Sequence, residues 1–168
     1  NHSVDETDSL IGSFNDPRIK LFKVRNHGVI AVSRNLGLKH ALGEYIAFLD
    51  SDDWWKPKKL EISLEYLEQD TDLVYHDLFT VVKAHQKIFW KKTCARDLKR
   101  PIFNDLLGNG NGLLNSSVVI RKELLNKVKG LSEDKNLVAA EDYEAWLRIA
   151  KVSEKFKKIP QTLGYYWA

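Results

Sequence analysis

The chain has 168 residues, enough to bury a sizeable core, and its 43% hydrophobic and 29% charged residues are typical of a folded globular protein. A net charge of +3 is too small to indicate nucleic-acid binding by itself, and a single cysteine, Cys94, excludes an internal disulfide. No apolar run approaches the length of a membrane-spanning helix, and the first residues lack a signal-peptide pattern. We therefore expect a cytoplasmic protein.

The first part of the chain predicts two helices around one strand. A short helix is expected near residues 7–14, and residues 19–24 alternate apolar and basic side chains, which predicts a strand with one wet face. A longer helix is expected over about 29–42. Gly37 inside it costs roughly 1 kcal/mol relative to alanine, so we expect this glycine to allow close packing on a sheet.

The next stretch combines a short apolar run with three acids. Residues 45–49 predict a buried strand, which stops at Asp50, Asp52 and Asp53. Burying three unpaired carboxylates would be prohibitive, so they must lie at the end of the strand, in water or on a cation. Two acids separated by one residue can face one hard divalent ion. Alternatively, the acids form a turn and the N-cap of a helix that begins at Pro57.

The remaining elements alternate in the same way. Further helices are expected from Pro57, over 102–107, over 122–127 and from Glu141. Further strands are expected over 72–75, 80–82, 87–90, 117–120, 156–159 and 163–167. This alternation predicts an α/β fold whose sheet is largely parallel, with strand 45–49 at its centre and Asp50 and Asp52 in the largest cleft.

Three other segments have two interpretations each. Basic residues interleave with Phe89 and Trp90; they are Lys87, Lys91, Lys92, Arg96, Lys99 and Arg100. They form either an ordinary solvated face or a contact with an anionic substrate or membrane surface. The glycine-rich loop 108–112 is a candidate lid. Glu141 and Asp142 open a helix, where acids are favoured by the macrodipole, but they are also candidate catalytic carboxylates.

Taken together, these motifs resemble the family 2 glycosyltransferases of the GT-A fold. The resemblance rests on Asn35-Leu36-Gly37, Gly43-Glu44-Tyr45-Ile46, Phe48-Leu49-Asp50-Ser51-Asp52-Asp53, Pro57, Lys59-Leu60 and the segment 141–148, with a weaker match over 3–7. It covers nearly the whole chain in order. It implies one GT-A domain over 1–168, a three-layer α/β sandwich with a mainly parallel central sheet. It also implies that the family's N-terminal strand–helix–strand is missing.

The resemblance implies an inverting, metal-dependent enzyme that moves a sugar from a nucleotide-diphosphate donor to an acceptor hydroxyl. The cofactor would be Mn²⁺ or Mg²⁺, with Asp52 as its ligand and Asp50 on the metal's water shell or the ribose. Ser51 and Asp53 complete this nucleotide-sugar-binding segment, and Arg34 is expected to contact a phosphate because a guanidinium matches phosphate geometry.

For catalysis, the resemblance selects Asp142 as the general base, with Glu141 as its alternate. The implied partners are a nucleotide-sugar and a saccharide or lipid-linked acceptor in surface polysaccharide or glycolipid synthesis, with possible contact to the inner face of the membrane and none to nucleic acid. A haloacid dehalogenase-type phosphatase is a competing class, but its motif needs Thr or Val where Trp54 stands. A non-catalytic glycosyltransferase-like binding module is the other alternative.

Overall fold

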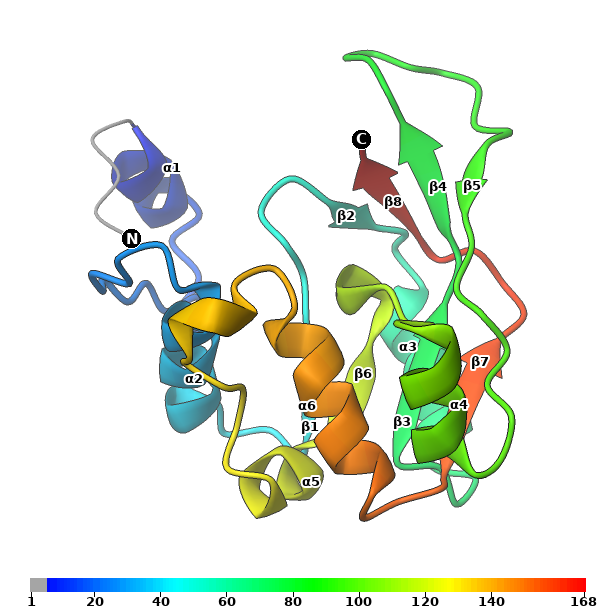
Figure 1. Ribbon diagram of the computed structural model, residues 1–168. Coiled ribbons are helices and arrows are strands. Elements are labelled where there is room, and N and C mark those ends of the chain that lie inside the picture. Colours follow the sequence, from blue (N-terminus) through cyan, green and yellow to red (C-terminus); the bar gives the residue numbers. More distant parts are fainter. Residues whose placement is uncertain (1–5) are drawn as a thin grey trace.

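The computed structural model describes residues 6–168, so segment 3–7 lies mostly outside the described residues (Figure 1). The helices are α1 (Thr7–Ser13), α2 (Ile30–His40), α3 (Lys59–Leu67), α4 (Ile102–Asn109), α5 (Lys122–Lys127) and α6 (Glu141–Ala150), with short 3₁₀ turns η1 (Asn115–Ser117) and η2 (Lys135–Leu137). The strands are β1 (Tyr45–Ala47), β2 (Trp54–Trp55), β3 (Leu73–His76), β4 (Leu78–Val81), β5 (Lys92–Thr93), β6 (Val119–Arg121), β7 (Phe156–Ile159) and β8 (Gly164–Trp167).

The main sheet is buried on both faces. It has four strands in the order β1-β6-β3-β7. Leu73 and Tyr75 of β3 pack with Trp146 of α6 in one hydrophobic cluster, whereas Val74, between them, packs with Leu67 of α3 in another. Because successive strand residues point to opposite faces, α4 and α6 cover one face and α3 the other. The three-layer α/β arrangement is therefore confirmed.

The pairing within this sheet corrects two expectations. β1, β3 and β7 run in the same direction, but β6 lies antiparallel between β1 and β3. β1 is consequently an edge strand among residues 6–168, not the centre of the sheet. The reason is that η1, just before β6, lies beside Asp50 at the finishing end of β1, so the chain enters β6 from that end and must run back. The order of elements along the chain does not reveal the antiparallel direction of β6 or the edge position of β1.

A second four-stranded sheet has the order β2-β8-β4-β5. β4 pairs with β8 in parallel, and β2 and β5 each flank them in antiparallel fashion. The predicted strand 87–90 is wrong, because the partner of β4 is Lys92–Thr93 and residues 87–90 belong to the connection between them. The side chain of Gln86 explains the difference, since its amide already bonds Thr80 O, Val82 N and Ile88 O.

Two further predictions from the first part of the chain are wrong. Residues 19–24 pair with no other strand among residues 6–168, and Ile19, Leu21 and Phe22 are exposed, so the alternating pattern alone does not make a strand here. Gly37 does not support close packing, since a Cβ built there would meet nothing within 4 Å. Within residues 6–168, no helix combines the length and apolarity needed to cross a bilayer.

Candidate active site

Arg34 joins three segments that are far apart in the sequence. From α2, its Nη2 donates to Oδ1 of Asp50 at 2.6 Å and its Nη1 donates to Oε1 of Glu141 at 2.8 Å. The arginine side chain is 16% exposed and that of Glu141 only 5%, so this ion pair is largely shielded from water, whereas the Asp50 side chain is 37% exposed. The structure thus brings together the predicted residues of the helix 29–42, the acidic segment and the distal Glu141-Asp142 pair.

Two residues that the sequence analysis did not single out hold Asp50. Asn115 donates its amide to Oδ1 of Asp50 at 3.0 Å, and the backbone N–H of Asp50 donates to Oγ of Ser116 at 3.0 Å. Nε1 of Trp55 donates to the carbonyl oxygen of Ser116 at 2.7 Å. In the sequence, these residues could have been noticed only as the polar triplet Asn-Ser-Ser between apolar residues. All three residues of the triplet are buried in η1.

The acidic segment forms a turn but does not cap a helix. The N–H of Asp53 donates to the carbonyl of Asp50 at 3.1 Å, which closes the turn. α3 begins at Lys59, and its N-cap residue Lys58 makes no side-chain capping bond, so the helix-cap interpretation of the acids is wrong. Asp53 instead accepts a hydrogen bond from the Trp167 N–H at 3.0 Å. Burial raises the pKa of Asp53, and hydrogen bonds from Ser116 and Trp167 offset only part of this rise.

Asp52 and Ser51 face solvent at the tip of this turn. Among residues 6–168, Asp52 makes no hydrogen bond or ion pair, and the second oxygen of Asp50 is also without one. No group of three or more acids, histidines or cysteines in this part of the chain could enclose a metal. Two carboxylates completed by water and a diphosphate are nevertheless a usual ligand set for Mg²⁺. The oxygen donors present therefore fit an ion shared with a bound nucleotide.

The two adjacent acids at the start of α6 have different surroundings. Glu141 is neutralised by Arg34, and its Oε2 is buried without a hydrogen-bond partner in the described residues. Asp142 is half-buried, and its Oδ1 accepts a bond from the Tyr143 N–H at 2.6 Å. Burial raises the pKa of Asp142, while the Tyr143 N–H and the charge of Arg34 lower it. Within residues 6–168, Asp142 thus has no cationic partner at contact distance, whereas the carboxylate of Glu141 is held by Arg34.

The acids lie outside the two largest cavities described, contrary to expectation. These are a hollow of about 670 Å³ bordered by Lys56, Phe79 and Leu163 and one of about 520 Å³ in the connection between β4 and β5. A smaller hollow of about 370 Å³ runs between α2 and β1, with Arg34 and Leu49 at its border. The candidate lid 108–112 is tethered, because Arg96 bonds the carbonyls of Gly110 and Gly112.

Comparison with known proteins identifies the family. The sequence pattern described as Glycosyl transferase family 2 matches residues 1–129. An Escherichia coli protein named UDP-Glc:alpha-D-GlcNAc-diphosphoundecaprenol beta-1,3-glucosyltransferase WfgD is 33% identical over 89% of this chain and 55% of its own length. An uncharacterized glycosyltransferase of Rickettsia conorii is 49% identical over 43% of this chain and 12% of its own length.

The fold agrees with this assignment. The crystal structure of residues 1–349 of S. aureus TarS in complex with UDP superposes with a TM-score of 0.71 at 18% identity, over 99% of this chain and 49% of that one. The chain spans about half or less of the length of these relatives. The GT-A-like α/β fold that the resemblance implied is therefore confirmed, and the chain belongs to glycosyl transferase family 2.

Proposed function

We propose that this chain carries out glycosyl transfer from a nucleotide-diphosphate sugar to an acceptor hydroxyl, with inversion at the anomeric carbon. The observation that carries the proposal is the Arg34-centred cluster, which unites the acids after β1 with the two acids of α6. A UDP-sugar donor is supported by the UDP in the TarS complex and by the donor in the name of WfgD. The name of WfgD also supports a lipid-linked acceptor. Together with that of a Bacillus subtilis relative, named Putative teichuronic acid biosynthesis glycosyltransferase TuaG, it supports a role in surface polysaccharide synthesis.

The mechanism assigns separate work to the two groups of acids. Asp142 accepts the proton of the acceptor hydroxyl as that oxygen attacks the anomeric carbon from the face opposite the leaving diphosphate. Asp52 and the free oxygen of Asp50 would hold Mn²⁺ or Mg²⁺, which neutralises charge on the diphosphate when bound. Ser51 and Asp53 would shape the same turn.

Arg34 contributes by positioning. Both of its terminal nitrogens are occupied by carboxylates, so a donor phosphate would have to share them or replace Asp50. The guanidinium holds the carboxylates of Asp50 and Glu141 in place relative to each other. Because Asp142 follows Glu141 at the start of α6, the same contact would also set the position of Asp142. A direct phosphate contact by Arg34 remains part of the proposal. The expected cytoplasmic localisation also remains a prediction.

The proposal is tested by separating donor binding from transfer. Asp142→Asn should keep UDP binding and lower the transfer rate by roughly 10²-fold or more, because only the proton acceptor is removed. Since burial raises its pKa, transfer by the parent chain should decline as pH falls at values above the ordinary aspartate pKa of 3.8, and the variant should lack this decline.

Glu141→Gln is the matched comparison, since it removes the neighbouring charge and keeps its shape. It should reduce transfer less than Asp142→Asn does. If Glu141→Gln loses transfer while Asp142→Asn keeps it, Glu141 is the proton acceptor instead of Asp142. If the parent chain binds UDP but transfers nothing from a panel of UDP-sugars to polyprenyl-diphosphate saccharides, the non-catalytic module is the correct interpretation.

A further inference from the structure

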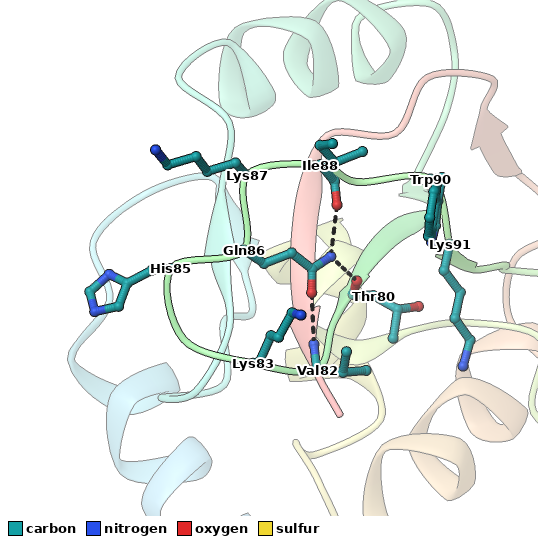
Figure 2. A pocket seen from close by; sticks show the side chains of 9 residues that line it. All are labelled: Thr80, Val82, Lys83, His85, Gln86, Lys87, Ile88, Trp90 and Lys91. Carbon is teal, nitrogen blue, oxygen red and sulfur yellow. Dashed lines mark hydrogen bonds between the residues drawn. The ribbon is translucent and has the colours of Figure 1, made fainter.

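The connection between β4 and β5 is a preformed projecting loop. We call residues 82–92, which are the connection together with Lys92 at the start of β5, the β4–β5 loop; it surrounds the hollow of about 520 Å³. Figure 2 shows the Gln86 side chain directed into the middle of the loop, where Oε1 accepts from the Val82 N–H at 3.2 Å and Nε2 donates to the carbonyls of Thr80 at 3.3 Å and Ile88 at 3.0 Å. These three bonds join the start of the loop to its far side through one side chain.

The loop presents large apolar side chains to solvent. Val82 is 58% exposed, Ile88 71% and Trp90 85%. Neighbouring exposed apolar side chains of this size are typical of an interaction surface.

The same loop carries only positive or neutral charge. Its basic side chains are Lys83, His85, Lys87, Lys91 and Lys92. No acidic residue occurs between Asp77 and Asp97; residues 17–43 are a longer stretch of the chain without an acid. In Figure 2, the side chains of His85 and Lys87 extend from one side of the loop, and that of Lys91 extends on the opposite side. None of these four lysines forms an ion pair with the described part of the chain.

We propose that the β4–β5 loop docks on an anionic lipid bilayer. Trp90, Ile88 and Val82 would enter the interface between headgroups and acyl chains, where amphipathic tryptophan is favoured, and the lysines would meet lipid phosphates. The complementarity of charge selects lipid over a neutral protein surface. The loop projects from the end of the molecule toward which the acid-bearing segment after β1 rises (Figure 1), so docking would turn that end to the bilayer.

The proposal rests on the proposed function only for its purpose, which is to bring a lipid-linked acceptor within reach. Vesicle binding itself needs neither donor nor transfer. Failure to bind vesicles would therefore leave the transfer reaction standing, and failure to transfer sugar would leave the docking surface standing. The two ideas can be rejected separately.

The experiment is co-sedimentation with vesicles of phosphatidylglycerol and phosphatidylcholine, or of phosphatidylcholine alone. The parent chain should sediment with the anionic vesicles and far less with the neutral ones, and about 0.5 M salt should weaken binding. Lys87→Glu with Lys91→Glu should lower the partition coefficient on the order of 10²-fold or more at low salt. Trp90→Ser, which keeps every charge, should lower it roughly tenfold.

The matched control is Lys39→Glu with Lys127→Glu, an identical change in net charge at exposed positions of α2 and α5. It should bind like the parent chain, and the thermal midpoints of all variants should agree. Equal loss in control and loop variants would mean that only net charge matters, and equal binding by all would reduce the loop to a solvated face. If Trp90→Ser instead changes the oligomeric state and leaves vesicle binding intact, the loop is a contact between copies. Each of these results overturns the proposal.

Discussion

Lys59 is a fully buried lysine at the start of α3. Its Nζ lies 4.3 Å from the centre of the Trp55 ring and has no hydrogen-bond partner among the described residues. Burial lowers the pKa of Lys59 to about 7. Burial, aided by the charge of Lys59, also lowers the pKa of His76 to about 4. Both groups bind protons more weakly in the folded than in the unfolded chain, so both make stability rise with pH.

We predict that Lys59→Met stabilises the protein at pH 7 and flattens its stability profile. In the parent chain, the free energy of unfolding should rise between pH 7 and about 10.5 by up to a few kcal/mol, because only the unfolded chain keeps the lysine proton there. Methionine fills a similar volume without that charge, although the contact with Trp55 offsets part of the gain. Denaturant unfolding at pH 7 and pH 10 measures this, with the exposed neighbour Lys58→Met as control. An unchanged pH slope in Lys59→Met would contradict the assignment.

A second prediction at this scale concerns Asp52. Asp52→Ala should abolish the Mn²⁺-dependent part of UDP binding and change the free energy of unfolding by less than about 0.5 kcal/mol, since the side chain is exposed and unpaired. Calorimetric titration with and without Mn²⁺ provides the measurement. The exposed Asp97→Ala is the control and should bind as the parent does. Equal metal dependence in Asp52→Ala and the parent would remove Asp52 from the metal site.

At the scale of elements, β8 depends on a close approach at Gly164. This residue pairs with Trp55 of β2, and a Cβ there would lie 2.9 Å from Cδ2 of Leu78, 3.0 Å from the carbonyl oxygen of Trp54 and 3.3 Å from Cδ1 of Trp55. Since the backbone of β2 is one of the obstacles, rotation of a side chain cannot relieve the contact. β8 also supplies the N–H that fixes Asp53, so packing here reaches the site.

Gly164→Ala should therefore destabilise the protein by roughly 1–3 kcal/mol through overpacking. Gly37→Ala should have the opposite sign, with a gain of roughly 0.5–1 kcal/mol, because its Cβ would point into open space on α2. Chemical denaturation of the two variants side by side tests both. A stabilised Gly164→Ala would show that β2 and β8 move apart easily.

At the scale of the whole molecule, Arg34 is the link between α2, the acidic turn and α6. Arg34→Met should cost roughly 3–5 kcal/mol, because it leaves the buried Glu141 carboxylate unpaired. Adding Glu141→Gln should restore a large part of this loss, since the unpaired charge is then gone. Denaturant unfolding of the two single variants and the double variant gives the coupling energy. Additive losses would mean that the ion pair contributes little to stability.

The sequence allowed the α/β class to be predicted and the acids of the candidate site to be singled out, because both depend on local pattern. An apolar run followed by Asp-Ser-Asp-Asp, and two acids at a helix start, are visible without a fold. The antiparallel insertion of β6 and the missing strand at 19–24 were not accessible, because strand partners are chosen by contacts distant in the chain. Asn115 and Ser116 were missed for the same reason, since a polar triplet reads as an ordinary turn until Asp50 lies beside it.

The long separation between the partners of Arg34 has a consequence for how the protein is made. Glu141 follows Arg34 by 107 residues, and Asp50 follows it by 16. At 5–20 residues per second, a ribosome needs roughly 5 to 20 s to add the second carboxylate after the arginine has been joined. For that interval the nascent chain holds a half-formed site, with a guanidinium and an acidic turn but no α6 to cover them. Since β7 and β8 follow α6 in the chain, both sheets are completed only after the two carboxylates can meet the arginine.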